Sequence, residues 1–454
     1  MSGLPSGWAA TNIAEIGDLV GGKTPSKAEP RFWANGTVTW VSPKDMKVFD
    51  LAGSEDQISE TAISDGGMNL LPAQSILMVT RSGILSHTFP VAITRNPVTI
   101  NQDIKAITPT AAFNTRYLAY NLKSQQRAIL NGCAKSGTTV ESIETEQLKR
   151  LPIPLAPLPE QKRIADKLDN VLARVDACRD RLDRLPALLK RFRQSILAAA
   201  TSGRLTEDWR EKQAIDNWGS DISFGELGKV SGGLTKNGKR SELQLQKPYL
   251  RVANVYANEL RLEDVASIGM TQQEFSKTCL QRDDLLIVEG NGSIDQVGRV
   301  AIWSAEVPDC SHQNHLIRWR AGPRLLPKFA LYFLLSPEGR SQIIDVASST
   351  TGLHTLSISK VSGMSVPVPS LPEQTEIIRR VEILFAFADR LEARLTTARR
   401  QVGQLTPALL AKAFRGELVP QDPADEPAAE LLKRLAAQRE TAPKTNRGRK
   451  IASR

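Results

Sequence analysis

A phosphate-binding loop is the first chemical site that residue spacing suggests. Gly233, Gly238 and Lys239 have the spacing of such a loop, in which backbone amides and the lysine hold a nucleotide's phosphates. However, Arg240 occupies the position of the Ser or Thr that binds Mg²⁺, and no buried strand is expected before the glycines. The pattern therefore does not predict nucleotide binding, and we expect no cofactor.

A metal site is the second possibility. Cys310, His312 and His315 are close together, but a fourth ligand would have to come from Cys279 or His354. The cysteines do not form paired CxxC ligands. We therefore expect no bound metal, and we interpret this stretch as a polar strand or loop.

Catalytic motifs do not emerge elsewhere in the sequence. There is no Asn-Pro-Pro-Tyr sequence of the kind that methyltransferases use, and no acidic cluster typical of nucleases. The sequence therefore predicts a protein that is not an enzyme, with any reaction carried out by partners.

A larger set of side chains has the chemistry of nucleic-acid contact. Arg and Lys can bind guanine edges, Asn and Gln adenine edges, and Lys, Arg, Ser and Thr phosphates. Taken singly, each is more often a solvated surface group, but many recur at matching points of two chain halves. The candidates are Lys44, Thr80, Arg81, Ser82, Asn101, Gln102, Ser136, Thr138, Arg251, Asn291, Ser293, Arg299, Gln313, Asn314, Ser349, Thr351 and His354.

The two halves are an internal duplication. Leu158 to Gln161 recurs as Leu371 to Gln374, and the same offset continues without a gap to Leu205 and Leu418. Weaker matches precede this segment, so the order globular, helical, globular, helical is predicted. The expected boundaries are 1–157 (globular), 158–212 (helical), 213–370 (globular), 371–420 (helical) and 421–454 (a C-terminal helix and basic tail).

Each helical segment has apolar residues alternating at steps of three and four, which is the pattern of a coiled coil. Four or five heptads give a rod of about 60 Å, longer than an amphipathic helix that lies on a small domain. We expect the two helices to pair antiparallel within one chain, with a kink or break at Pro186 and Pro407. The expected pairing residues are Ile164, Leu168, Val175, Leu182, Leu189, Ile377, Val381, Leu391, Leu395 and Val402.

Each globular segment has the signals of a mixed α/β (α+β) domain. Short apolar runs between Gly, Asn and Pro turns predict strands at 75–80, 91–94, 284–288 and 300–303. Short helices are expected at 116–123 and 328–336, and proline-rich linkers should run extended into the long helices. The predicted fold is two such domains with pseudo-two-fold duplication, joined by two long antiparallel helices.

Composition and charge indicate the cellular compartment and the class of protein. The 454 residues contain no apolar run long enough to span a membrane and no basic, apolar leader, so membrane and secreted proteins are disfavoured. Four cysteines at unrelated spacings favour a reducing cytoplasm. The net charge of +10 is concentrated outside the two globular segments, partly in the tail from Ala442 to Arg454, which we expect to be disordered.

A protein family is recognisable from these residues. The stretches Gly21 to Ser26, Phe32-Trp33 and Trp40 to Met46 resemble the first target recognition domain of type I restriction-modification specificity subunits. The stretches Tyr249 to Val255, Gly298 to Ala301 and Ser311 to Arg318 resemble the second target recognition domain of that family. The two helices that begin with Leu-Pro-Glu-Gln are similar to the family's conserved regions. The resemblance covers residues 5 to about 420.

The resemblance implies a specific role. In that family, each globular domain reads one half of a split, asymmetric double-stranded DNA target. The helices hold the halves apart and dock two methyltransferase subunits, to which restriction translocase-nuclease subunits are added.

Two alternatives stay open at this stage. A coiled-coil scaffold with two protein-binding heads would also explain nearly neutral globular domains. A recognition subunit of another restriction class could be built from the same parts.

Overall fold

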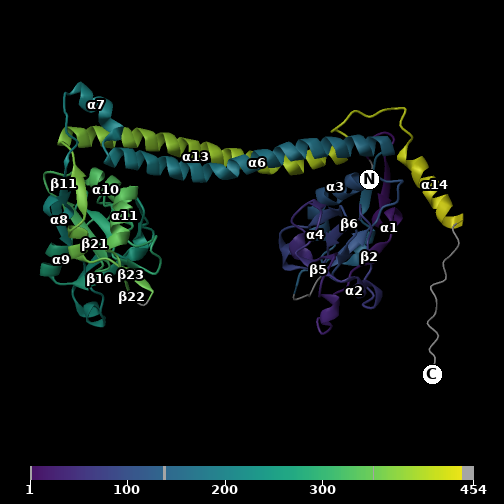
Figure 1. Cartoon of the computed structure of the whole chain (residues 1–454), viewed down its shortest axis with the longest axis horizontal. Coiled ribbons are helices and arrows are strands. Elements are labelled where there is room, and N and C mark those ends of the chain that lie inside the picture. The colour runs from purple at the N-terminus through teal and green to yellow at the C-terminus, as the bar shows by residue number, and fades with distance from the viewer. Residues whose placement is uncertain (1–2, 136–139, 351, 442–454) are drawn as a thin grey trace. The chain divides into compact units, whose positions relative to one another are not determined.

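The computed structural model describes residues 3–135, 140–350 and 352–441. The chain forms two units (Figure 1). Unit 1 contains the residues up to Arg181 and those from Arg399 onward, and unit 2 contains Leu182–Ala398. Each unit thus consists of one globular domain with parts of both long helices.

Unit 1 is built on a five-stranded sheet and a three-stranded sheet. The first has the order β2 (Leu19–Gly21), β9 (Ile104–Ile107), β6 (Ile76–Val79), β7 (Val91–Thr94), β4 (Asp50–Leu51). The second has the order β5 (Asp56–Ile58), β3 (Val38–Val41), β8 (Thr99–Ile100). Its short helices are α1 (Ile13–Ile16), α2 (Glu60–Ser64), α3 (Thr115–Ser124), α4 (Gln126–Gly132) and α5 (Thr145–Lys149).

Unit 2 repeats this plan. Strands β12 (Gly228–Ser231), β21 (Leu316–Ala321), β17 (Leu285–Val288) and β19 (Val300–Ile302) follow the order of β2, β9, β6 and β7. Strands β16 (Ala266–Met270), β13 (Leu245–Leu250) and β20 (Ser311–His312) form the second sheet. The expected duplication and α/β class are therefore confirmed.

The other elements of unit 2 are short. A third sheet has the order β18 (Gly290–Asn291), β23 (Leu353–Thr355), β22 (Ser348–Thr350). A hairpin is formed by β14 (Val255–Tyr256) and β15 (Glu259–Leu260). The helices are α7 (Glu207–Lys212), α8 (Phe224–Leu227), α9 (Gln272–Thr278), α10 (Pro327–Leu335), α11 (Pro337–Val346) and α12 (Ile358–Ser362).

The proline-rich linkers are extended, as expected, but they are also paired. In unit 1, β10 (Pro152–Leu155) pairs antiparallel with β1 (Ala9–Asn12). In unit 2, β24 (Ser365–Val368) pairs with β11 (Ser220–Ser223) in the same way. Proline is tolerated there because each pair has only two strands, so one side of each strand needs no amide donor.

Two 44-residue helices, α6 (Leu158–Thr201) and α13 (Leu371–Phe414), carry the predicted heptads. Both continue through their internal prolines, so the expected local break at Pro186 and Pro407 is wrong, and the alternative of a kink there stays a prediction. A proline removes one hydrogen bond but has a backbone φ compatible with the helix, and the remaining bonds hold each helix together.

The two helices are antiparallel. In unit 1, the apolar core combines Leu168, near the start of α6, with Leu410, near the end of α13. In unit 2, the core combines Ile196, near the end of α6, with Ile377, near the start of α13. This arrangement confirms two domains joined by paired helices.

The repeated Leu-Pro-Glu-Gln sequence has a structural role at each joint. Gln161 is fully buried, accepts a hydrogen bond from the Asn114 amide (3.0 Å) and donates one to the Ala156 carbonyl (2.8 Å). Gln374 is equally buried and accepts from the Leu326 amide (2.8 Å). Asn114 and Leu326 immediately precede α3 and α10, so each glutamine connects a long helix to a domain helix.

The neighbouring glutamates are buried as well. Glu160 accepts a hydrogen bond from the Trp8 indole (3.1 Å), and burial raises the pKa of its carboxyl. Glu373 accepts from Thr206 (2.7 Å) and from the Arg210 guanidinium (2.6 Å). Each glutamate therefore binds a chain segment that lies outside the sheets of its own unit.

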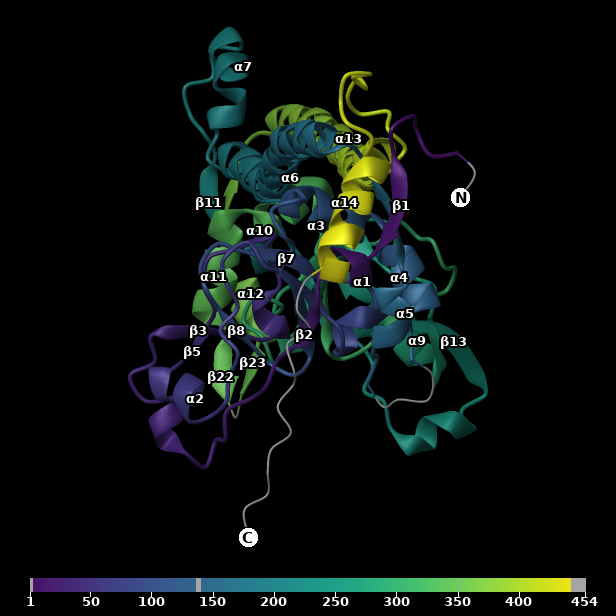
Figure 2. The same ribbon diagram turned by 90° about the vertical axis from the view of Figure 1, so that its right-hand side faces the viewer.

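The last described helix, α14 (Ala428–Thr441), belongs to unit 1 and lies beside α1 (Figure 2). Ala428 is fully buried, and its amide donates to the Gly7 carbonyl at 2.8 Å. Arg163 pairs with Asp425 at 2.7 Å. The predicted C-terminal helix is present, whereas the basic stretch 442–454 lies outside the described residues.

Within the described part of the chain, no helix combines the length and the apolar character needed to cross a lipid bilayer.

The buried glutamine of unit 1 leads to a stability prediction. Gln161→Ala should leave the Asn114 amide and the Ala156 carbonyl without partners, lowering the free energy of unfolding of unit 1 by about 2 to 4 kcal/mol. Hydrogen exchange should accelerate in α3 and β10 but not in unit 2. Lys162→Ala is the control, because Lys162 is exposed and should change stability by less than about 0.5 kcal/mol. Unchanged exchange in Gln161→Ala would contradict this role.

Candidate nucleic-acid interface

Corresponding loops of the two units share one backbone frame. The Thr80 amide donates to the Asp103 carbonyl (2.8 Å), and the Glu289 amide donates to the His315 carbonyl (2.9 Å). The amides of Asn101 and Gln313 likewise donate to the last residue of the neighbouring strand, Val41 or Leu250, at 2.9 Å in both units. The weak sequence matches thus correspond to equivalent positions.

Glycines allow a third loop to approach this frame closely. A Cβ at Gly22 would lie 2.1 Å from the Ile100 carbonyl oxygen, and one at Gly233 would lie 2.1 Å from that of His312. The next amide donates to the same oxygen in each unit. Gly233 is therefore needed for backbone packing, and its phosphate-loop spacing has a structural explanation.

We call these sets recognition edges. Edge 1 consists of residues 22–24, 80–82 and 101–103, and edge 2 consists of residues 233–234, 289–291 and 313–315.

Edge 1 is organised around the Asp103 carboxylate. Asn101 is buried, donates to that carboxylate (3.0 Å) and accepts from the Asp103 amide (3.1 Å). Gln102 is exposed, donates to the same carboxylate (3.2 Å) and accepts from Thr24. Asn101 therefore positions the loop from inside, whereas the Gln102 side chain lies at the surface.

The remaining candidates of edge 1 differ in exposure. Thr80 is buried and donates its hydroxyl to the Asp103 carbonyl (3.2 Å). Arg81 is exposed, and half-buried Ser82 caps a short 3₁₀ helix through the Ile84 amide (3.4 Å). Ser136, Thr138 and Thr351 lie outside the described residues.

Edge 2 carries different side chains. His315 Nδ1 lies 2.8 Å from Glu289 Oε2, and the two side chains are 56% and 31% exposed. Gln313 and Asn314 are half-buried beside them.

The adjoining three-stranded sheet brings three predicted residues into one row. Asn291 is opposite His354, and His354 is opposite Ser349. Asn291 also accepts a hydrogen bond from the amide of exposed Ser293 (3.0 Å). Three candidates that are far apart in the sequence, Asn291, Ser349 and His354, thus lie together at edge 2.

The candidate cations away from the edges have acidic or aromatic partners. Lys44 contacts Glu55 (2.9 Å) and Asp56 (3.0 Å), and hydrogen bonds to these carboxylates raise the pKa of Lys44. Arg251 pairs with Asp264 at 2.7 Å. The Arg299 guanidinium lies 4.8 Å from the centre of the Tyr256 ring. A phosphate would have to compete with these internal partners.

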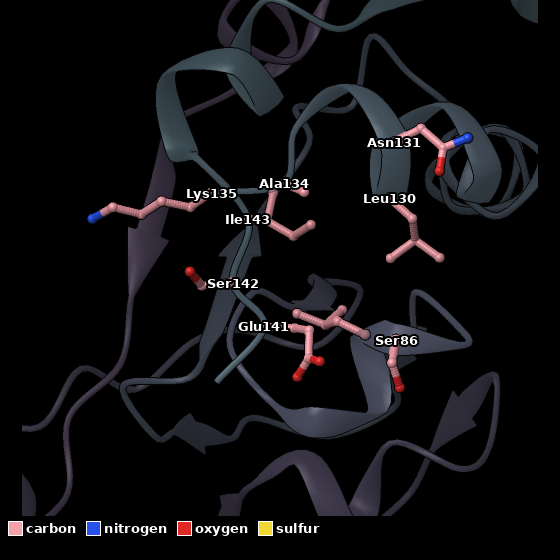
Figure 3. Close-up of a pocket in the computed structure, with 9 residues that line it drawn as sticks. Ser86, Leu130, Asn131, Ala134, Lys135, Glu141, Ser142 and Ile143 are labelled. Carbon is pink, nitrogen blue, oxygen red and sulfur yellow. The ribbon is translucent and has the colours of Figure 1, made fainter. Parts of the chain in front are cut away.

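A pocket of about 370 Å³ adjoins edge 1 (Figure 3). Its lining includes Ser86, Asn131, Lys135, Glu141 and Ser142, and the Lys135 side chain points away from Asn131. The Glu141 carbonyl accepts a hydrogen bond from the Ser82 amide (3.1 Å), and this bond connects the pocket to edge 1.

The cysteine and histidines considered for metal have separate surroundings. Cys310 and His312 are buried, and His312 Nδ1 lies 3.0 Å from the Leu316 carbonyl. Burial lowers the pKa of His312 to about 4, so the ring is neutral at pH 7. His315 instead faces Glu289. Among the described residues, His, Cys, Asp and Glu form no group of three or more able to hold a metal ion.

The predicted pairing residues of the helices fall into two classes. Buried positions are Ile164, Leu168, Val175, Ile377, Val381, Leu395 and Val402, whereas Leu182, Leu189 and Leu391 are half-buried. The half-buried leucines help line a largely apolar, open pocket of about 320 Å³ in unit 2. The helix pair is therefore packed most closely near the domains and less closely around Leu182, Leu189 and Leu391.

Comparison with known proteins identifies the family. The model of the type I restriction modification DNA specificity domain matches residues 5–187 and 216–398, so it covers both halves of the duplication. This chain belongs to that family. Each matched range contains one recognition edge, one Leu-Pro-Glu-Gln sequence and the first part of one long helix.

Several specificity subunits are similar along most of the chain. The EcoKI specificity subunit of Escherichia coli K12 is 34% identical over 337 residues, which is 71% of each chain. The StySPI specificity subunit of Salmonella potsdam is 29% identical over 452 residues, or 96% of each chain. The solved HsdS subunit from Thermoanaerobacter tengcongensis has the same fold, with a TM-score of 0.58, 16% identity, and coverage of 91% of this chain and 98% of that chain.

The candidate set did not include Asp103 or His315. Asp103 organises edge 1, and His315 was considered only as a possible metal ligand. Alignment at the offset that matches Asn101 with Gln313 places both residues at the same position, and this was the available signal. The His315–Glu289 contact joins residues 26 positions apart and was not visible in the sequence.

The geometry of edge 1 predicts different effects for a buried and an exposed candidate. Asn101→Ala should destabilise unit 1 by about 1 to 3 kcal/mol, because the Asp103 amide and carboxylate lose a buried partner. Arg81→Ala, a change at an exposed position of the same edge, should alter stability by less than about 0.5 kcal/mol. Hydrogen exchange of the unit 1 sheet measures both. Equal protection in both variants would contradict the positioning role of Asn101.

Proposed function

We propose that this chain is the DNA-recognition subunit of a type I restriction-modification complex. Each globular domain reads one half of a bipartite, asymmetric target in double-stranded DNA. The observation that carries the proposal is the repeated backbone frame, with Asn101, Gln102 and Asp103 in one unit and Gln313, Asn314 and His315 in the other. A shared frame with different polar groups is what two modules need in order to read two different sequences.

The family match supports this assignment over a scaffold with two protein-binding heads. Both matched ranges are DNA specificity domains, and the duplicated architecture provides two separate readers. We propose 1–157 and 213–370 as the two target recognition domains, 158–212 and 371–420 as helical spacers, and 421–454 as a C-terminal extension.

The long helices have two proposed roles. As continuous elements connecting the domains, they set the length of the non-specific spacer between half-sites. They also offer apolar side chains to partners, because Leu188, Ile383 and Phe387 are 53%, 53% and 46% exposed. We propose that two methyltransferase subunits dock on the helices and that restriction translocase-nuclease subunits join the assembly.

In this proposal the chain has no catalytic activity of its own, and methyl transfer and cleavage belong to the partners. The complex acts in the cytoplasm, where it meets DNA.

Salt dependence of duplex binding tests the nucleic-acid role. The assembled complex with methyltransferase subunits should lose affinity steeply with added salt, because each neutralised phosphate releases counterions. Contact with six or more phosphates predicts a loss of about a thousandfold or more between 50 and 200 mM salt. Duplexes from the host genome and fluorescence anisotropy provide the assay. A complex that assembles but binds no duplex at low salt would support the scaffold alternative instead.

Matched insertions test the spacer role. Seven residues added after Arg181 in α6 and seven after Ala398 in α13 preserve both heptads and lengthen the helix pair by about 10 Å. At about 3.4 Å per base pair, the methylated motif should keep both half-sites and gain roughly three base pairs of spacer, less whatever DNA bending absorbs.

Insertion in α6 alone is the control. The seven added residues then have no partner positions on α13, which should impair assembly. Normal methylation at the original spacing by the doubly inserted variant would show that the helices do not set the distance.

A further inference from the structure

The two recognition edges share backbone positions but differ at the point where side chains face outward. The Thr80 and Glu289 amides donate to the carbonyls of Asp103 and His315, so Thr80 corresponds to Glu289 and Asp103 to His315. In edge 1 the Thr80 side chain is buried, and the Asp103 carboxylate accepts from Asn101 and Gln102. That carboxylate is therefore already engaged inside the loop.

In edge 2 the same two positions carry a pair of side chains that reach solvent. The Glu289 carboxylate holds His315 Nδ1 at 2.8 Å, and the imidazole is 56% exposed. The backbone of Glu289 is itself fixed, because its carbonyl accepts from the Leu356 amide (2.8 Å). An exposed side chain with a restrained orientation loses little conformational entropy when it binds a ligand.

The hydrogen bond also determines what the imidazole can offer. When Nδ1–H donates to Glu289, the other nitrogen of a neutral ring, Nε2, is an acceptor. The Asn314 side-chain nitrogen lies 3.5 Å from Nε2, and a base amine has to replace this long contact. The Glu289 carboxylate is an acceptor as well. Acceptors in the major groove select the exocyclic amines of adenine (N6) or cytosine (N4) over the carbonyl oxygens of thymine and guanine.

We propose that His315, held in place by Glu289, is a specificity-determining residue of unit 2 and reads adenine or cytosine at one position of its half-site. This inference rests on the proposed function. His315 contacts the base, and Glu289 is a positioning residue that fixes the ring and its tautomer. The corresponding positions of unit 1, Thr80 and Asp103, have no such pair, which gives the two half-sites different readers on one frame.

The test is the methylated motif of cells that express the complete system with variants of this chain. His315→Ala should leave one half-site and the spacer unchanged and reduce discrimination by about tenfold at one position of the other half-site. Glu289→Gln should relax the same position less, because the glutamine can still contact His315. Lys328→Ala is the matched control, because it removes an exposed ion pair with Glu382 elsewhere in unit 2.

The outcomes separate the two levels of the proposal. If the wild-type system methylates no bipartite motif, the proposed function fails. If the wild-type motif is bipartite and His315→Ala methylates the same motif with the same selectivity, only the reading role of His315 fails. Loss of assembly or a lower thermal unfolding midpoint in both edge 2 variants, but not in Lys328→Ala, would make the pair structural and would also overturn the inference.

Discussion

The architecture depends on one buried contact that occurs twice, the side-chain amide that joins a long helix to a globular domain. Gln161 and Gln374 each satisfy a backbone amide at the start of a domain helix. Each also donates to the carbonyl of the residue that directly follows the strand before the long helix, Ala156 or Pro369. Because unpaired buried amides are costly, this contact favours a single orientation of each domain on its helix. The adjacent glutamates bind further chain segments and reinforce the joint.

The two units have the same side-chain contacts at their helix joints but different side chains at their recognition edges. Both edges keep the same backbone hydrogen bonds and the same glycine approach, yet their outward side chains differ in charge and in hydrogen-bonding capacity. Such a division lets the exposed polar groups of an edge change without disturbing the helices, because the shared backbone bonds do not involve those exposed side chains. The physical basis of modular recognition is therefore a fixed frame with replaceable donors and acceptors.

The sequence predicted what depends on periodicity and repetition, and it was weaker where contacts are long-range. The gap-free repeat and heptads indicated the duplication and paired helices, although tolerance of Pro186 and Pro407 was missed because the surrounding helical bonds outweigh one lost bond. Among the candidate residues, Asn101 proved to be internal, and Lys44 and Arg251 have acidic neighbours. The pairing of His315 with Glu289 depends on which strands lie side by side, which composition and local spacing do not reveal.

In the proposed function, each globular domain reads its own half of the target. Replacing residues 1–150 with those of another specificity subunit of the family, followed by single-molecule sequencing of the methylated motif, tests this independence. One half of the motif should change while the other half stays the same, because the replacement leaves unit 2 and both long helices unaltered. A motif in which both halves change together would contradict it.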